Sequence, residues 1–476
     1  MDRKTRKNLL TVLFVGIILG AFLLAQYPRA SQGGAAPSPK YIFIFLADGA
    51  GSAHLEIARQ YNRTIHNEGL VISDKIMREG SLGLLTTHAA DFLTTDSAAA
   101  ATALAAGCKA KISAVGMCAD GSVPKTVMEI AREKGMRIGL VTNSRIYDAS
   151  PAAFALHAQN RKLYSPMVEQ YLKLEPEVLL GGGRDQFLPR SHKGSGREDD
   201  RDIIASFKKR GYAYVSTKNE LKEAKGAKVL GLFSLLDMSF EIDRDNDEEP
   251  SLRDMAQAAI RLLESGNRRG FVAFIENENV DTAGHLNDIA ALIHEMREFD
   301  RAVGLAYEFF KQRPKETLIL VLSDHETGGL GFASTIKMSR FTGQASIDFA
   351  PQEELRKLQG IRISLRKASE LLGENPSPDA VDRLMREHFK GFEITPELET
   401  AIMKPRSLGP AFYPGTTAAA LGAMVAFNTQ AYWSTTGHTS QPVFVGALGV
   451  GAERFRGYQD NTDFGKHLIA LLREKR

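Results

Sequence analysis

The sequence predicts an α/β fold in which a mostly parallel sheet lies between helices. Short and almost fully apolar runs occur at 41–47, 271–275 and 317–323, as expected for strands that are buried on both faces of a parallel sheet. Between them lie segments with the three- and four-residue spacing of amphipathic helices, for example from Asp288 to Phe310. The chain has 476 residues, 43% of them hydrophobic, which is enough for a large buried core.

The N-terminus predicts an export or anchoring segment ahead of this fold. Basic residues within 2–7 precede an apolar run of seventeen residues, 9–25, as in the charged and apolar regions of a signal peptide. This run also reaches the lower limit of a membrane span, and no A-x-A cleavage site follows it, so an uncleaved anchor is an alternative. Residues 31–39 are rich in Gly, Pro and Ser and predict a tether. We assign 1–39 to a signal peptide or anchor plus linker, and 40–476 to the main domain. We expect the protein to be periplasmic or extracellular, or tethered to the membrane through 9–25.

The segment Thr95-Asp96-Ser97 stands at the head of an Ala-rich run that favours a helix. Helix N-termini attract anions, because their unpaired N–H groups and the macrodipole both present positive charge. Ser97 is therefore well placed to meet a phosphate group. The alternative is that Asp96 or Ser97 only caps the helix, and this segment alone does not decide between the two.

Carboxylates follow the three predicted strands. Asp48, Glu276 and Asp324 come at or directly after the ends of the apolar runs. Because the carboxyl ends of parallel strands lie along one edge of a sheet, we expect these groups to converge. Crowded carboxylates repel one another unless cations hold them, and His285 and His325 add nitrogen ligands that suit zinc. The pattern therefore predicts a metal centre.

Two further motifs extend this predicted centre. Asp281 and His285 are four residues apart and so lie on one side of a helical turn. This spacing alone is more typical of surface residues. Together with Asp324-His325 and with His438 near the C-terminus, it strengthens the prediction of a metal site.

Over about residues 40 to 455 the chain resembles bacterial alkaline phosphatases. The resemblance rests on the order and spacing of motifs, which are Asp48-Gly49, Thr95 to Ala99, Asp148 to Phe154 with Arg161, Val178 to Arg184 with Phe187 and Pro189, and Asp324-His325. It implies a three-layer α/β/α sandwich with a helical cap or crown insertion at about 334–405. It also implies hydrolysis of phosphate monoesters through a phosphoserine intermediate, with release of inorganic phosphate.

The resemblance also implies a role for each site residue. Ser97 would be the nucleophile, and Arg161 would clamp the substrate phosphate with its planar, bidentate fork. The implied cofactors are two zinc ions and one magnesium ion. The implied metal ligands are Asp281, His285 and His438 for the first zinc, Asp48, Asp324 and His325 with Ser97 for the second, and Asp48, Ser150 and Glu276 for magnesium, with Asp148 acting through metal-bound water.

One residue departs from the family pattern. Position 282 is Thr, where well-known members often carry lysine or histidine. We therefore expect Asp148 to lack a cationic partner near the phosphate, and this departure leaves open how phosphate affinity and magnesium occupancy compare with those of the well-known enzymes.

Other functions remain as alternatives with different predicted features. A sulfatase needs C/S-x-P-x-R around its nucleophile, and residues 97–100 lack both Pro and Arg. A phosphodiesterase of the same superfamily usually lacks the third-metal ligands, so Ser150, Glu276 and Arg161 favour the monoesterase. A non-catalytic phosphate or metal binder has no need of the hydroxyl together with every ligand.

The formal charge of +3 without basic patches gives no reason to expect a nucleic-acid partner. The insertion shapes either substrate entry or oligomer contacts, for instance in a homodimer, and the sequence leaves this open.

The remaining conspicuous residues predict structural roles. Cys108 and Cys118 lack metal or redox spacing, and we expect them to close a short disulfide loop. His294, in a helical pattern, and His157, in the Ala-rich segment before Arg161, are expected to have packing roles rather than to bind a metal. The acidic run 243–249 predicts a solvated loop rather than a calcium site. His54, His66, His88, His192, His388 and His467 have no partners that the sequence identifies.

Overall fold

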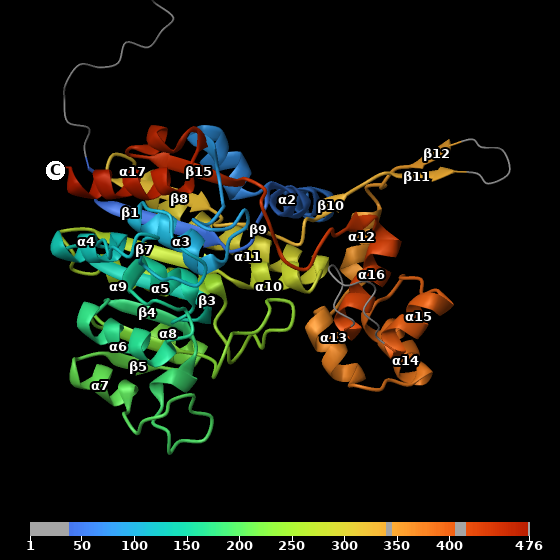
Figure 1. Cartoon of the computed structure of the whole chain (residues 1–476), viewed down its shortest axis with the longest axis horizontal. Helices are drawn as coiled ribbons and strands as arrows, with labels where there is room; N and C mark the ends of the chain where they lie inside the picture. Colours follow the sequence, from blue (N-terminus) through green and yellow to red (C-terminus); the bar gives the residue numbers. More distant parts are fainter. Residues whose placement is uncertain (1–37, 339–344, 405–415, 475–476) are drawn as a thin grey trace, which may run out of the picture. The chain divides into compact units, whose positions relative to one another are not determined.

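The computed structural model describes residues 38–338, 345–404 and 416–474. Its main feature is a ten-stranded sheet with strand order β16-β2-β15-β8-β1-β7-β3-β4-β6-β5 (Figure 1). Its strands are β1 Tyr41–Ala47, β2 Ser81–Leu85, β3 Arg137–Arg145, β4 Val178–Gly182, β5 Ala213–Val215, β6 Val229–Leu232, β7 Phe271–Asn277, β8 Thr317–Leu322, β15 Val443–Gly449 and β16 Gly457–Gln459. Strand β15 is antiparallel to β2 and β8, and the other neighbours in this sheet pair in parallel. The mostly parallel sheet is thereby confirmed.

The three predicted strands are neighbours in the middle of this sheet, because β1 pairs with both β7 and β8. The residues of β1 alternate between two hydrophobic cores. Tyr41, Phe43 and Phe45 belong to one core, and Ile42 and Ile44 belong to the other. This alternation is what a strand with both faces buried requires.

Each core lies between one face of the sheet and a layer of helices (Figure 1). One face of the sheet packs against α2 Ser52–His66, α8 Lys218–Glu223, α9 Leu252–Glu264 and α11 Ile289–Gln312. The opposite face packs against α3 Ser97–Ala106, α4 Val127–Glu133, α5 Ala149–Ala155, α6 Tyr164–Leu174, α7 Ile203–Lys209 and α17 Asn461–Arg473. The three-layer α/β/α architecture is confirmed.

Two local predictions are also confirmed. Helix α11 begins directly after Asp288, whose carboxylate caps it by accepting a hydrogen bond from the Ala291 N–H at 3.0 Å. Cys108 and Cys118 form a disulfide. The short helical segments η1 Ile72–Met77, η2 Arg184–Phe187 and η4 Ala452–Phe455 complete the described elements of the main domain outside the site.

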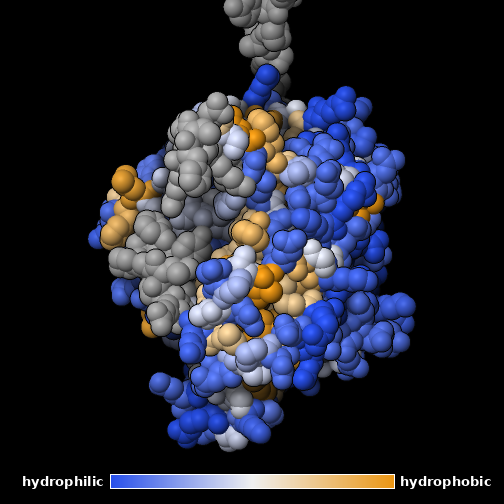
Figure 2. Space-filling view, turned by 90° about the vertical axis from the view of Figure 1, so that its right-hand side faces the viewer, coloured by the Kyte–Doolittle hydropathy of each residue, from blue (hydrophilic) through white to orange (hydrophobic). Residues whose placement is uncertain are grey.

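The long excursion before His438 contains a ribbon and several helices. Strands β10 Gly331–Phe332 and β13 Ala431–Tyr432 pair and close it. Between them lie β11 Thr335–Met338, β12 Ala345–Asp348, α12 Glu354–Lys357, η3 Leu358–Gly360, α13 Leu365–Leu372, α14 Pro378–His388, α15 Pro396–Met403 and α16 Thr417–Thr429. Figure 2 views the side of the molecule that carries these elements, where apolar atoms gather among hydrophilic ones. Among its described residues, Leu371 and Phe427 are exposed. A role as a cap stays a prediction.

This excursion is joined to the main domain at the start of α13. The Ser364 N–H donates to Asp243 at 2.9 Å, and the Leu365 N–H donates to Asp288 at 2.6 Å. Asp288 therefore caps α11 and also accepts the first N–H of α13, whose N-cap is Ser364.

The predicted signal peptide or anchor, apart from residues 38 and 39, lies outside the described residues. Within the described residues, no helix combines the length and apolar character that a membrane span requires.

Candidate active site

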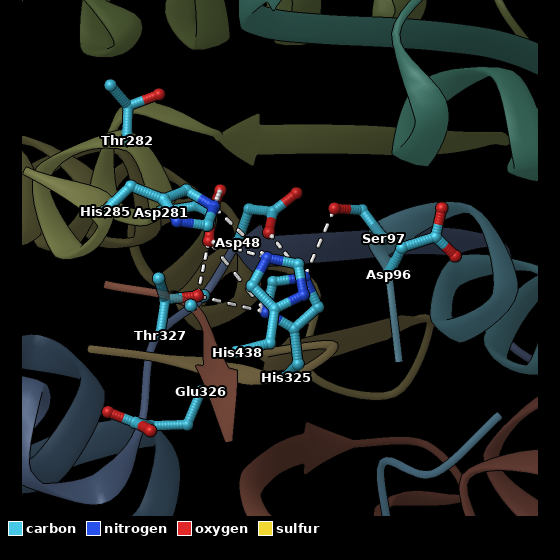
Figure 3. A network of polar contacts seen from close by, with 12 residues as sticks. Asp48, Asp96, Ser97, Asp281, Thr282, His285, His325, Glu326, Thr327 and His438 are labelled. Atoms are coloured by element: carbon cyan, nitrogen blue, oxygen red, sulfur yellow. Dashed lines mark hydrogen bonds and ion pairs between the residues drawn. The ribbon is translucent and has the colours of Figure 1, made fainter. Parts of the chain in front are cut away.

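The first group of predicted ligands meets where β7 leads into α10 Asn279–His285. Asp281 Oδ2 lies 3.1 Å from His285 Nε2, and that nitrogen lies 3.2 Å from His438 Nε2 (Figure 3). The other ring nitrogens face backbone carbonyls, because His285 Nδ1 lies 2.5 Å from Thr436 O and His438 Nδ1 lies 2.7 Å from Thr95 O. Donation from Nδ1 leaves each Nε2 with a lone pair for a metal ion.

The second group lies at the ends of β1 and β8. His325 Nε2 is 3.4 Å from Asp48 Oδ1 and 3.3 Å from Asp324 Oδ2. Both carboxylate oxygens are buried and have no hydrogen-bond partner in the described part of the chain. Burial, and then the repulsion from Asp324, raises the pKa of Asp48 well above its usual range. Burial and the charge of Asp281 raise the pKa of Asp324 to about 7.

These two groups fit zinc by their donor atoms and spacing. Each contains carboxylate oxygen and imidazole nitrogen, which are common zinc ligands, and two ligands at about 2.0–2.1 Å from a tetrahedral ion lie about 3.3 Å apart. A cation between Asp48 and Asp324 would also supply the partner that their orphaned oxygens lack. In the described residues, these are the two groups of acids and histidines with metal-binding spacing.

Ser97 is the first residue of α3 and faces the second group. Its Oγ lies 3.2 Å from His325 Nε2. The helix is capped by Asp96, whose Oδ1 accepts a hydrogen bond from the Ala99 N–H at 3.0 Å. Capping therefore falls to Asp96, and the Ser97 hydroxyl points to the predicted metal ligands instead (Figure 3).

The predicted magnesium ligands lie on the far side of Asp48. Ser150 Oγ, in α5, donates to Asp48 Oδ2 at 3.2 Å. Glu276 Oε2 accepts a hydrogen bond from the Thr142 hydroxyl at 2.6 Å, and burial raises the pKa of Glu276 to about 8. A set of carboxylate and hydroxyl oxygens suits a hard cation such as magnesium. The sequence analysis missed Thr142, since nothing in its local pattern connects it with Glu276.

Asp148 has a cationic partner, so the prediction that it lacks one is wrong. Arg161 Nη2 lies 3.0 Å from Asp148 Oδ1, and Arg161 Nη1 lies 3.4 Å from Asp96 Oδ2. The cation thus comes from the turn between α5 and α6, whereas position 282 lies in α10. Thr282 donates its hydroxyl to Glu278 Oε1 at 2.9 Å, and it lies apart from the metal ligands in Figure 3.

Two residues directly after the Asp324-His325 motif were also missed. Thr327 donates its hydroxyl to Asp281 Oδ1, and Glu326 is a carboxylate with 2% exposure. Their position beside the motif was the one available signal.

The residues assigned to structural roles lie outside both groups. His157 contacts Glu129 and the Gly116 carbonyl, and burial lowers the pKa of His294 in α11 to about 4. In the acidic run, Asp243 accepts a hydrogen bond from the Ser364 N–H, and Glu249 accepts hydrogen bonds from the Ser239 N–H and hydroxyl.

Comparison with known proteins identifies the family of the chain. The family model for alkaline phosphatase matches residues 39–473. Alkaline phosphatase 4 of Bacillus subtilis (strain 168) is 30% identical over 97% of this chain and 95% of its own length. The repressible alkaline phosphatase of Saccharomyces cerevisiae is 30% identical over 99% of this chain and 88% of its own.

A solved structure supports the same relationship. The alkaline phosphatase of Thermus thermophilus superposes with a TM-score of 0.79 at 27% identity, over 92% of this chain and 94% of that one. The chain therefore belongs to the alkaline phosphatase family of enzymes.

Proposed function

We propose that this enzyme hydrolyses phosphate monoesters through a phosphoserine at Ser97, with two zinc ions and one magnesium ion as cofactors. The observation that carries the proposal is the surroundings of His325 Nε2. Ser97 Oγ lies 3.2 Å from this nitrogen, and the two orphaned carboxylate oxygens of Asp48 and Asp324 lie 3.4 Å and 3.3 Å from it. A nucleophile beside unpaired buried acids is the arrangement that metal-assisted phosphate transfer needs.

The metal ligands follow from the geometry and the family pattern together. The first zinc would be held by Asp281, His285 and His438, the second by Asp48, Asp324 and His325, and magnesium by Asp48, Ser150 and Glu276, with Asp148 acting through water. When bound, these ions supply positive charge that stabilises the serine alkoxide and the leaving oxygen and lowers the pKa of water.

Ser97 carries the covalent chemistry. Its Oγ attacks phosphorus, so that the Oγ–P bond forms while the bond from phosphorus to the ester oxygen breaks and the alcohol leaves. Water then cleaves the phosphoserine and releases inorganic phosphate. Because Ser97 opens a ten-residue helix, the free N–H groups of the first turn also favour the phosphate.

Arg161 binds and orients the phosphate. A guanidinium has five N–H donors, and the ion pairs to Asp96 and Asp148 engage one from each terminal nitrogen. The remaining donors would bind two phosphate oxygens side by side, which a lysine would not do.

The finer assignments of place and assembly remain proposals. We propose a periplasmic or extracellular location, or a tether through residues 9–25, because the Cys108–Cys118 disulfide is typical of an oxidising compartment. A homodimer stays a prediction.

Trapping of the phosphoenzyme tests the nucleophile. Labelled phosphate is mixed with the enzyme at low pH, and the protein is denatured and counted. We expect label on the wild type and on Ser122→Ala, which removes a hydroxyl bonded to Asp120, but none on Ser97→Ala. Label retained by the Ser97→Ala protein would refute the assignment.

Glu276 separates the monoesterase from the diesterase alternative. A monoester has three non-bridging oxygens, and the third has to be met on the magnesium side, whereas a diester carries a second ester group there. We expect Glu276→Ala to lower kcat/KM for an aryl phosphate at least about tenfold, which is about 1.4 kcal/mol, and to change a diester rate far less. Glu298→Ala removes a buried glutamate of α11 and should affect both substrates alike. Equal losses in Glu276→Ala, with two zinc ions retained, would favour the diesterase.

A further inference from the structure

Glu326 is a buried carboxylate that the proposed chemistry does not use. It is 2% exposed and lies in β9 Glu326–Thr327, directly after His325. Successive residues of an extended segment point to opposite sides. His325 and Thr327 thus face the metal groups, and the carboxylate of Glu326 points away from them (Figure 3).

The first contact of Glu326 is with the segment that brings back His438. Strand β14 His438–Thr439 pairs with β9, so that His438 lies opposite Thr327 and Thr439 lies opposite Glu326. The Thr439 hydroxyl donates to Glu326 Oε2 across this pair. Each of these segments has only two residues in the ladder, and backbone bonds of Gly328 to residues 434, 435 and 437 join the same segments. The bond to Glu326 is the side-chain link that adjoins His438 directly.

The second contact holds the turn that follows β9. The Gly329 N–H donates to Glu326 Oε1 at 2.8 Å, and the Gly328 N–H donates to Gly437 O at 2.9 Å. Gly328 and Gly329 have φ of +92° and +60°, which side chains rarely tolerate. Both carboxylate oxygens of Glu326 are therefore engaged in the same junction.

The third contact is with the loop after Asp48. A Cβ atom on Gly51 would come within 2.3 Å of Glu326 Cγ, so the two residues are packed directly together. His54 Nδ1 accepts a hydrogen bond from the Gly51 N–H at 2.8 Å, which leaves the hydrogen of His54 on Nε2. That nitrogen lies 3.8 Å from Glu326 Oε1.

We propose that Glu326 is a positioning residue that fixes His438, through Thr439, in the first metal group. Glu326 and Thr439 are 113 residues apart in the sequence, so the return segment pays the entropy of closing a long loop. A buried bond to a carboxylate, fixed at one end against the loop after Asp48, adds to the backbone bonds that offset this cost and acts on the residue next to His438. The inference rests on the proposed function, because it takes Asp281, His285 and His438 as a zinc site.

Zinc affinity of the metal-free protein tests the proposal. The stripped enzyme is titrated with zinc against a coloured chelator, which reads binding without activity. Loss of a group bonded directly to a metal ligand weakens binding by about 10–100-fold, and Glu326 acts one residue further out, through Thr439, so the low end of this range applies. We therefore expect Glu326→Ala to bind one zinc at least about tenfold more weakly than the wild type, and the other within about threefold.

Two variants control for charge and for general stability. In Glu326→Gln the amide oxygen can still accept from Gly329, and the amide NH₂ can donate to the Thr439 hydroxyl, so we expect both affinities to be restored within about threefold. Asp300→Ala removes another buried carboxylate, 7% exposed, which bonds the N–H groups of 71 and 72. It should leave both zinc affinities within about threefold.

A double-mutant cycle shows whether the effect passes through His438. Thr439→Val removes the hydroxyl with little change of shape and serves also if Glu326→Ala does not fold. We expect it to weaken one zinc at least about tenfold in the wild type, and less than about twofold further in His438→Ala, because the ligand that it positions is already gone.

The outcomes of these titrations distinguish a failure of the positioning role of Glu326 from a failure of the proposed function. If the wild type binds two zinc ions and both Glu326→Ala and Thr439→Val bind them as tightly, the positioning role is refuted and the proposed function stands. Equal weakening of both zinc ions, or the same loss in Asp300→Ala, refutes it as well, because it reduces the effect to stability. If the wild type itself binds fewer than two zinc ions, the proposed function fails and this inference fails with it.

Discussion

Asp300 in α11 predicts a pH dependence of stability that a single substitution should remove. Its carboxylate accepts hydrogen bonds from the Val71 N–H at 3.1 Å and the Ile72 N–H at 2.9 Å. Burial raises its pKa to about 7, with Asp74 adding to the rise and Arg301 opposing it. An aspartate in the unfolded chain has a pKa of about 3.9. Between these two values the folded protein holds a proton that the unfolded chain has released.

The sign and size follow from this difference. The folded state binds more protons, so this group lowers the free energy of unfolding as the pH rises from about 4 to about 7. One pH unit is worth about 1.4 kcal/mol per proton, which gives a loss of about 2 kcal/mol between pH 5 and pH 7. Asn does not titrate. The free energy of unfolding of Asp300→Asn should therefore rise relative to the wild type by about 2 kcal/mol over this range.

Urea unfolding of the metal-free proteins at several pH values measures the effect. Chelation keeps zinc binding from adding its own pH dependence. Asp202→Asn serves as the control, because Asp202 caps α7 from an exposed position, and its difference from the wild type should stay constant. A difference for Asp300→Asn that does not change between pH 5 and pH 7 would refute the reasoning.

The remaining predictions concern the phosphate site and the metals. Arg161→Lys should weaken inhibition by inorganic phosphate at least about tenfold, because lysine offers a point charge in place of a planar fork. Arg145 pairs with Asp237, and the control Arg145→Lys should change this inhibition little. Equal effects of the two substitutions would contradict the assignment of Arg161. Thr282→Lys should change phosphate inhibition less than about threefold, because the new ammonium meets Glu278 first. Thr282→Lys with Glu278→Gln should tighten it, and tightening by the single variant would show that Glu278 does not hold the ammonium. Removal of metal by a chelator should lower Tm, and zinc should restore it, since at a hundredfold excess over Kd a ligand of the folded state adds about 2.7 kcal/mol; an unchanged Tm would speak against resident ions.

The sequence by itself determined the local elements and the kinds of ligand. The apolar run ending at Asp48 predicted β1, because a strand buried on both faces has to be apolar along its length. The apolar spacing from about Asp288 to Phe310 predicted α11, since periodicity is a property of neighbouring residues. The parallel sheet then brought Asp48 and Asp324 to one edge, as expected from strand direction alone.

Only the tertiary structure decided which side chains pair within the site. Nothing near position 282 indicated that Arg161 would hold Asp148, and nothing near Glu326 indicated its bond to Thr439. His438 faces the Thr95 carbonyl across 343 residues of sequence. Such pairings depend on strand register and on how distant segments pack against one another. A local pattern fixes which chemical groups are available, whereas their partners are selected when the whole chain buries them together.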